Sequence, residues 1–164
     1  MKRSKKESVQ NKVLSREALA HLCSGWRVKG YKIIFTNGCF DILHEGHIAL
    51  LLTAAELGHK LVLGLNTDAS VKKLKGESRP INREQSRALV MAAQLYVDAV
   101  TLFDEDTPLE LIQAIRPDVI VKGGDYTPET VVGNDFVRSY GGEVVIVPTV
   151  QGFSTTNIIN KMKA

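Results

Sequence analysis

The sequence predicts a single α/β domain whose core is a five-stranded parallel sheet with helices on both faces. Five short runs rich in Val, Ile and Leu alternate with segments of helical length, which is the pattern of a sheet built from strand–helix–strand units. The runs are apolar at nearly every position, as expected for strands that are buried on both faces. At 164 residues, with 44% hydrophobic and 24% charged content, the chain suits one globular domain with a sizeable core.

Each predicted strand is a β-branched apolar run, and the first two end at clear turn signals. The first ends at Asn37-Gly38 and the second at Asn66. Crossovers between parallel strands are right-handed, so we expect an open, Rossmann-like, doubly wound sheet. In chain order the predicted strands are residues 32–37, 60–66, 98–103, 118–122 and 143–148.

The predicted helices are bounded by capping residues, glycine and proline. Ser15 is expected as the N-cap of the first helix, and Gly25 as its stop. Thr107 is expected as a second N-cap, with Pro108 at the first helical position and an end ahead of Pro117. In chain order the predicted helices are residues 15–26, 47–58, 68–74, 83–96, 107–115, 134–142 and 155–163.

The first twelve residues are basic, with five Lys or Arg side chains and one Glu. We interpret residues 1–12 as a solvated, flexible tail ahead of a domain at 13–164. The tail lacks the interleaved aromatic side chains of single-strand binders, so no nucleic-acid partner is expected. There is no apolar run of roughly 20 residues to cross a bilayer and no signal sequence. The two cysteines form no disulfide framework, so we expect a cytoplasmic protein with no membrane partner.

Polar and glycine-rich stretches follow the predicted strands and do not precede them. "NGCFDILHEGH" follows the first strand, "NTD" the second, "KGGDYTPE" the fourth and "QGFSTT" the fifth, whereas loops such as "ELGH" and "IRPD" are plainer. Ligands of open parallel sheets bind beyond the carboxyl ends of the strands, where the strand order reverses. The sequence therefore predicts a binding site along that edge.

His44 and His47, in "HEGH", lie at the start of a predicted helix. Their spacing differs from the i, i+4 pair of HExxH zinc proteases, and the third ligand that a catalytic zinc requires could come only from Cys39 nearby. Two histidines satisfied within the fold are another interpretation. The third is phosphate binding, because a helix N-terminus offers unpaired N–H groups beside the two imidazoles. The chain has no GxxxxGK[ST] loop and no GxGxxG after the first strand, which counts against P-loop and dinucleotide-dehydrogenase sites.

The stretch "TNGCFDILHEGH" resembles the HxGH signature of the cytidylyltransferase-like nucleotidyltransferases. "LNTDASVKKLKGESRPIN", "VDAVTLFDEDTP", "PDVIVKGGDYTPE" and "GFSTTNII", in this order, resemble the adenylyltransferase domain of bacterial ADP-heptose synthesis. The resemblance runs over residues 13–163. It implies adenylyl transfer from ATP to D-glycero-β-D-manno-heptose 1-phosphate, which gives ADP-heptose and pyrophosphate for lipopolysaccharide core or other heptose-containing glycans. Many members fuse this domain to a sugar kinase, so this chain looks like the stand-alone form.

The resemblance also implies which residues act. It gives catalytic roles at the phosphates to His44 and His47, and we choose Lys75 of "KKLKG" as a third catalytic residue. It implies Mg²⁺ with the ATP, a sugar 1-phosphate as partner and a homo-oligomer, and we assign no metal-ligating side chains. The expected nucleotide-binding residues are Thr36, Asn37, Gly38, Phe40, Asp41, Gly46, Asn66, Asp68, Arg87, Lys122, Gly123, Gly124, Asp125, Tyr126, Ser154, Thr155 and Thr156.

Some individual roles stay open at the level of sequence. Asp41 could bind Mg²⁺ or cap the helix that follows, and we expect capping because it is an Asp just ahead of a helix start. We interpret Cys39 as a small buried residue and not as a nucleophile. Arg87 matches a basic position of the superfamily, but Arg79, Arg83 and Arg87 could each be surface arginines.

Three other functions also remain open. One is a CTP-dependent cytidylyltransferase acting on glycerol 3-phosphate or a similar phosphorylated alcohol. That branch often has an Arg shortly before the Ser of its last motif, where this chain has Thr149 and Val150, and this departure leaves the γ-phosphate contact unassigned. The others are a non-catalytic, nucleotide-binding regulatory module and a nucleic-acid-associated protein that uses the basic tail.

Overall fold

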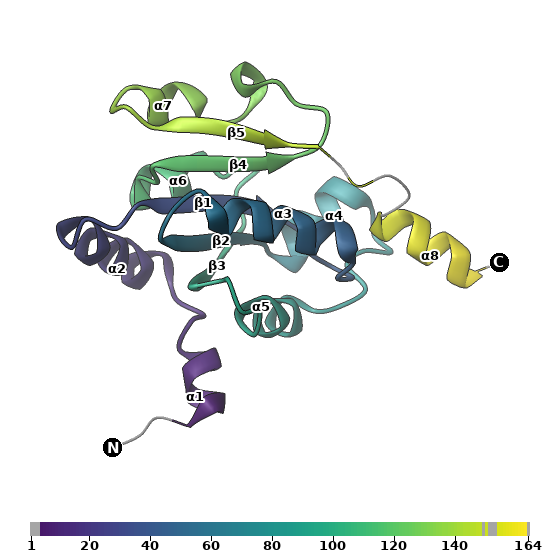
Figure 1. Ribbon diagram of the computed structural model, residues 1–164. Helices are drawn as coiled ribbons and strands as arrows, with labels where there is room; N and C mark the ends of the chain where they lie inside the picture. Colours follow the sequence, from purple (N-terminus) through teal and green to yellow (C-terminus); the bar gives the residue numbers. More distant parts are fainter. Residues whose placement is uncertain (1–3, 149, 151–153, 164) are drawn as a thin grey trace.

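Figure 1 shows the computed structural model of the chain, a twisted sheet with helices packed against both faces. The structure describes residues 4–148, 150 and 154–163. The five strands are all parallel and lie in the order β3-β2-β1-β4-β5, so the predicted doubly wound sheet is confirmed. In chain order the strands are β1 (Ile33–Gly38), β2 (Lys60–Asn66), β3 (Ala99–Phe103), β4 (Val119–Gly123) and β5 (Glu143–Val147).

The strand order reverses between β1 and β4. The chain runs outward from β1 to β2 and β3, and then returns to place β4 on the other side of β1. β1 is therefore the central strand, and its first four residues, from Ile33 to Thr36, are fully buried. The loops that leave β1 and β4 separate at the same edge of the sheet, which is where open parallel sheets bind ligands.

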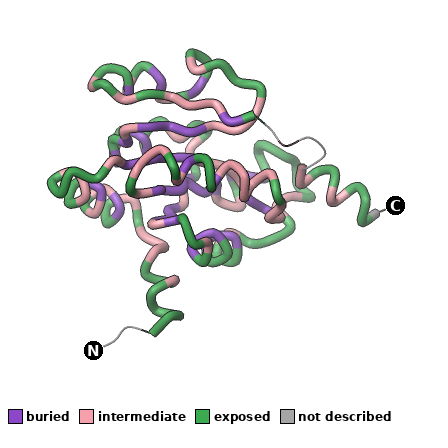
Figure 2. The backbone as a smooth tube through the Cα atoms, in the orientation of Figure 1, coloured by how far each residue is buried: buried purple, intermediate pink, exposed green. Residues whose placement is uncertain are grey.

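Two hydrophobic clusters attach the helices to the two faces of the sheet. Consecutive residues of β1, Ile34 and Phe35, belong to different clusters, because side chains of a strand alternate between faces. The cluster with Ile34 includes side chains of α3 and α5, and the cluster with Phe35 includes side chains of α2, α6 and α7. The purple, buried stretches of Figure 2 accordingly follow the strands.

The seven helices from α2 to α8 match the seven predicted ones in place, and α1 and the short 3-10 helix η1 are additional. Ser15 is the N-cap of α2, as predicted, and its Oγ accepts a hydrogen bond from the Ala18 backbone N–H at 3.2 Å. The helices are α1 (Lys5–Gln10), α2 (Arg16–Val28), α3 (Glu45–Glu56), α4 (Asp68–Lys75), α5 (Glu84–Ala92), α6 (Leu109–Ile115), the 3-10 helix η1 (Pro128–Thr130), α7 (Asn134–Arg138) and α8 (Thr155–Lys163).

Several helix ends differ from the prediction. Gly25 does not stop α2, which continues to Val28. α5 ends at Ala92, four residues before the predicted end. Pro108 is the N-cap of α6 and makes no side-chain capping bond, so the predicted capping by Thr107 is wrong. These ends depend on tertiary contacts, whereas the strands follow directly from their apolar runs.

The N-terminal segment is more structured than the flexible tail that its composition suggests. α1 begins with a capping box in which Ser4 and Glu7 each accept a hydrogen bond from the other's backbone N–H. Most of its residues are exposed, but Val9 packs against the cluster that includes Ile34, and Lys12 Nζ donates to the Val97 carbonyl at 2.6 Å. The segment is thus joined to the domain before residue 13. Over the described ranges, none of the helices has the length and apolarity that a membrane crossing needs.

Candidate active site

A cleft of about 640 Å³ opens at the carboxyl edge of the sheet. Its walls come from the loops after β1, β3 and β4, from the end of α4, and from the start of α8. The structure therefore brings together stretches that lie far apart in the sequence. The predicted site residues that line this cleft are Asn37, Gly38, Phe40, Asp41, His44, Gly46, His47, Asn66, Lys75, Lys122, Gly123, Tyr126, Ser154, Thr155 and Thr156. Thr149 and residues 151–153 of "QGFSTT" lie outside the described residues.

The two histidines form one stacked unit at the start of α3. His44 is the N-cap of this helix, and its carbonyl accepts from the His47 backbone N–H at 2.9 Å. The two ring centroids are 3.7 Å apart, with 22° between the ring planes. The ring of Phe40 lies 4.9 Å from that of His47 at an angle of 47°. The imidazoles are therefore held together and beside the free N–H groups of a helix end.

The turn that follows β1 explains how Phe40 reaches His47. Phe40 has a positive φ of 44°, which is uncommon for a residue with a side chain. A Cβ at Gly38 would lie 2.9 Å from Cε2 of the Phe40 ring, well inside van der Waals contact. Glycine at position 38 thus leaves room for the aromatic ring that packs on the histidine pair.

Both imidazoles are neutral at pH 7. Burial, the largest cause, and the neighbouring His44 together lower the pKa of His47 to about 4, although a hydrogen bond to the Ile42 backbone opposes the shift. Burial also lowers the pKa of His44. The Nδ1 atoms of both rings are buried and have no hydrogen-bond partner within the described part of the chain. A neutral imidazole carries one donor and one acceptor, so the pair can still bond to a ligand in the cleft.

Lys122 brings a partly desolvated positive charge to the cleft from the end of β4. Burial lowers the pKa of its ammonium group, and the Cys39 sulfur acts weakly in the opposite direction. Its Nζ lies 5.5 Å from the ring centroid of Tyr126, within the range of a cation–π contact. A buried ammonium gains most from an anionic partner, so this position suits a phosphate group.

Cys39 also lines the cleft, as a thiol. Burial raises its pKa, whereas the charges of Lys75, Arg87 and Arg79 lower it by less. Its Sγ is 4.0 Å from Oδ1 of Asn66, a weak contact. The environment keeps the sulfur protonated at neutral pH, in keeping with the expectation that Cys39 is not a nucleophile.

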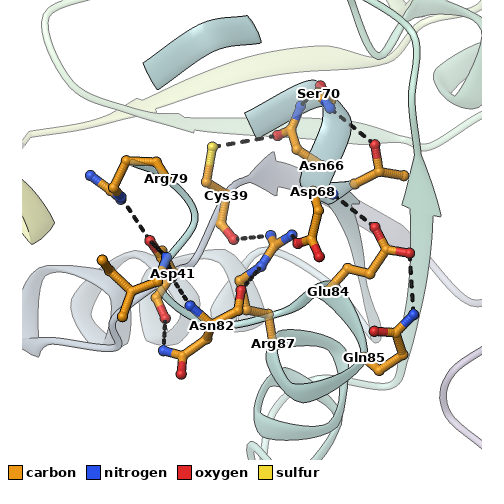
Figure 3. Close-up of polar contacts among 12 residues, drawn as sticks. Cys39, Asp41, Asn66, Asp68, Ser70, Arg79, Asn82, Glu84, Gln85 and Arg87 are labelled. Carbon is orange, nitrogen blue, oxygen red and sulfur yellow. Dashed lines mark hydrogen bonds and ion pairs between the residues drawn. The ribbon is translucent and has the colours of Figure 1, made fainter. Parts of the chain in front are cut away.

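Arg87, one of the predicted nucleotide-binding residues, does not line the cleft. Its side chain is fully buried, and it donates to the carbonyls of Asn82 at 2.9 Å and Cys39 at 2.7 Å. A third bond of 2.8 Å joins it to the carboxylate of Asp68 (Figure 3), which does not line the cleft either. Arg87 thus ties the loop after β1 and the start of α4 to the loop before α5.

The predicted capping role of Asp41 is also wrong. His44 occupies the N-cap of α3 and makes no side-chain capping bond. The Asp41 carboxylate instead accepts hydrogen bonds from the Ile81 and Asn82 backbone N–H groups and from Arg79 (Figure 3). Asp41 borders the cleft, but its oxygens are directed to a loop 40 residues away.

Three other predicted residues lie outside the cleft lining. Thr36 is fully buried in β1, and Gly124 and Asp125 belong to the loop after β4 without lining the cavity. Gly124 has a φ of +120°, and a Cβ there would touch the Tyr126 ring at 3.4 Å. Gly124 therefore supports the placement of Tyr126, which does line the cleft.

The structure adds lining residues that the sequence analysis did not assign to the site. Several follow β3, whose carboxyl end lies at the same edge as the others, so the strand-end rule could have found them. The apolar ones carry no local signal of a site, because apolar side chains are common in every part of the core. The additional lining residues are Cys39, Leu50, Leu74, Arg79, Phe103, Asp106, Thr107, Pro108, Val132, Val147, Pro148 and Val150.

Comparison with known proteins decides the family. The family model described as cytidylyltransferase-like matches residues 35–161, a span that contains all five strands except the first two residues of β1. The chain belongs to the cytidylyltransferase-like family. The stacked histidines and the cleft thus lie in a nucleotidyltransferase fold, and the resemblance seen in the sequence is confirmed.

Curated relatives in this cytidylyltransferase-like family are similar over nearly the whole chain. The bifunctional protein HldE of Caulobacter vibrioides is 58% identical over 93% of this chain and 32% of its own length. The protein of the same name from Syntrophotalea carbinolica is 56% identical over 93% of this chain and 31% of its own length. The chain thus spans about a third of the length of these relatives.

Solved structures agree with the fold. A lipopolysaccharide core biosynthesis protein from Thermoplasma volcanium matches with a TM-score of 0.61 and 28% identity, over 74% of this chain and 98% of the other. A pantoate-beta-alanine ligase from Francisella tularensis, solved with beta-gamma ATP and beta-alanine, has a TM-score of 0.63 at 14% identity, over 92% of this chain and 76% of the other. At that identity the ligase shows the shared fold alone.

Proposed function

We propose that the protein transfers the adenylyl group of ATP to D-glycero-β-D-manno-heptose 1-phosphate, releasing pyrophosphate and giving ADP-heptose. The observation that carries this proposal is the stacked pair of His44 and His47 at the start of α3, inside a cleft at the strand-order reversal. Such a site presents imidazole and backbone donors to phosphate oxygens. High similarity to proteins named HldE, and a matched structure named for lipopolysaccharide core biosynthesis, support the heptose acceptor.

The chemistry needs positioning and charge stabilisation rather than a base. A phosphate oxygen of the sugar is already ionised at neutral pH, so it can attack the α-phosphorus in line with the departing pyrophosphate without losing a proton. Neutral His44 and His47 would donate hydrogen bonds to phosphate oxygens as charge moves onto the leaving group. Lys122 would add a positive charge, and the hydroxyls at the start of α8 would add further donors.

We expect Mg²⁺ to enter the cleft with the triphosphate. Within residues 4–148, 150 and 154–163, no group of three or more His, Cys, Asp or Glu side chains is arranged to hold a metal ion. The ion would therefore be coordinated mainly by phosphate oxygens, where it neutralises charge on the reacting phosphates. The protein residues would position those phosphates around it.

Assembly and location are further proposals that rest on the sequence resemblance. We propose a homo-oligomer, a dimer or larger, in the cytoplasm. Light scattering during size-exclusion chromatography would give the mass, and an 18.0 kDa species would contradict the oligomer.

Pyrophosphate release tests the reaction. The protein is incubated with Mg²⁺ and each of ATP, CTP, GTP and UTP, against a panel of sugar 1-phosphates and glycerol 3-phosphate. We expect release only with ATP and heptose 1-phosphate. Release with CTP and glycerol 3-phosphate would replace the proposal by a cytidylyltransferase, and nucleotide binding without any release would replace it by a regulatory module.

A further inference from the structure

Arg79 lies in the loop between α4 and α5 and lines the cleft. Its side chain is 11% exposed, and its Nε donates to Oδ2 of Asp41 at 2.8 Å. We propose that Arg79 binds a substrate phosphate, with its guanidinium held in position by Asp41. This inference rests on the proposed function in one respect, since the phosphate belongs to one of the two substrates named there.

Asp41 is a fixed and charged anchor for this arginine. Its side chain is 1% exposed, and its carboxylate accepts from the backbone N–H groups of Ile81 and Asn82 at 2.8 Å each. Burial raises the pKa of Asp41, but the bonds from Asn82, Ile81 and Arg79 outweigh this and hold the pKa below its usual value. The carboxylate is therefore ionised at neutral pH and has little freedom to move.

The loop that carries Arg79 is fixed at a second place. Asn82 Nδ2 donates to the Asp41 carbonyl at 2.8 Å, and the Asn82 carbonyl accepts from Arg87. Arg87 also donates to the Cys39 carbonyl, so the loop after β1 and the loop before α5 are tied to one buried side chain. Arg79 is thus attached to the same rigid assembly that leads into the histidine pair.

Among the described residues, only one of the three guanidinium nitrogens of Arg79 has a hydrogen-bond partner. Figure 3 shows Nε directed at Asp41 and the two terminal nitrogens on the side away from it. In the described part of the chain these terminal nitrogens have no hydrogen-bond partner. An arginine in this arrangement can place two parallel N–H donors on a phosphate, which a lysine ammonium cannot do. If holding the loop were its only task, the three donors of Ile81 and Asn82 to Asp41 would already suffice.

The surroundings of Arg79 suit an anion. Lys75, at the end of α4, also lines the cleft, and the charges of Lys75 and Arg79 both act on the Cys39 sulfur. The two cations therefore converge on one region of the cavity. The phosphate that they meet is either the pyrophosphate end of ATP or the phosphate of the sugar, and both present the same oxygens.

Calorimetric titration with inorganic pyrophosphate and, separately, with heptose 1-phosphate tests the proposal and distinguishes these sources. The variants are Arg79→Ala and Arg79→Lys, and the control is Arg83→Ala, an exposed arginine of the same segment that does not line the cleft. We expect both Arg79 variants to bind one of the two phosphate compounds at least about tenfold more weakly than the wild type, because charged hydrogen bonds are lost. The affinities of the control variant should stay within about twofold of the wild type.

The titration in which binding is weakened identifies the phosphate that Arg79 contacts. The KM of the substrate that carries this phosphate should rise in the same variants. Thermal melting checks folding, and Arg79→Lys keeps the ion pair with Asp41 if the alanine variant unfolds. If Arg79→Lys binds pyrophosphate and heptose 1-phosphate as tightly as the wild type, Arg79 does not place paired N–H donors on a phosphate. The proposal also fails if the wild-type protein binds neither of these two compounds. If Arg79-dependent pyrophosphate binding is present but no heptose 1-phosphate is turned over, the proposed function fails and the role of Arg79 stands.

Discussion

Replacing Arg87 by methionine tests whether this side chain is a structural support rather than a nucleotide contact. Methionine fills a similar volume, so the change removes the guanidinium and leaves little cavity. Three hydrogen bonds are lost, to the carbonyls of Asn82 and Cys39 and to the Asp68 carboxylate, at 2.9, 2.7 and 2.8 Å. The side chain itself is fully buried, so water does not reach the two carbonyls without local opening.

The expected cost follows from these contacts. Hydrogen bonds with one charged partner contribute about 1.5–3 kcal/mol each, but they are not additive, and breaking a buried charged pair costs about 3–5 kcal/mol in total. The Asp68 side chain is 32% exposed and can be hydrated after the change. We therefore expect a loss in the lower part of that range, about 3–4 kcal/mol of unfolding free energy. For a chain of this length that corresponds to a decrease in Tm of roughly 6–15 °C.

Urea unfolding measured by circular dichroism, with thermal melting beside it, gives the change. The matched control is Arg83→Met, since Arg83 is the exposed N-cap of the same helix and makes no side-chain capping bond. The control should change the unfolding free energy by less than about 0.5 kcal/mol. A loss below about 1 kcal/mol in Arg87→Met, or an equal loss in both variants, would show that Arg87 does not hold the loops as described.

Three further predictions concern the histidines and the fold. His47→Ala should lower turnover at least a hundredfold, about 2.7 kcal/mol of transition-state stabilisation, with little change in Tm, and an unchanged rate would refute the catalytic role. Because folding lowers the pKa of His47 to about 4, its neutral form favours the folded state. Its contribution to stability is complete above pH ~6.5 and decreases as the pH falls towards 4. Urea titrations across this range should therefore show the wild type losing stability relative to His47→Gln as the pH falls, and parallel curves would contradict the shift. Gly133→Ala should destabilise the protein more than Gly141→Ala in thermal melts, by about 1–3 kcal/mol. Both glycines have positive φ, but only at Gly133 would a Cβ meet a side chain, Ile112 Cδ1 at 2.9 Å.

The sheet could be predicted from the sequence because its signals are local. β2 has the predicted bounds, 60–66, since a short apolar run between Gly58 and the turn signal at Asn66 is of strand length and too short for a typical buried helix. The end of α5 could not be predicted in the same way. The predicted helix runs through Gln94, but Lys12 donates to the carbonyls of Gln94 and Val97. That contact comes from a segment 82 residues away, and no local pattern reveals it.

The same distinction explains which of the predicted site residues line the cleft. The histidines follow β1 and Lys122 lies at the carboxyl end of β4, so the strand-end rule brings them to one edge. Arg87 and Arg79 both appear in the sequence as basic residues near a loop. Their burial, and the pairing of Arg79 with Asp41 at a separation of 38 residues, depend on how two loops pack. Sequence reasoning therefore assigned Arg87 to the nucleotide and left Arg79 as a possible surface residue.

The cations around the cleft differ in how much of their hydrogen-bonding capacity the protein itself uses. Each of the three nitrogens of Arg87 bonds to the protein, so this side chain fixes the loops and retains little capacity for a ligand. Toward the described residues Arg79 uses only Nε, and Lys122 is partly desolvated beside an aromatic ring. A phosphate entering the cleft would therefore meet charges that are already oriented and partly stripped of water. This lowers the reorganisation needed in the transition state, and it lets neutral histidines act as donors without themselves carrying the charge.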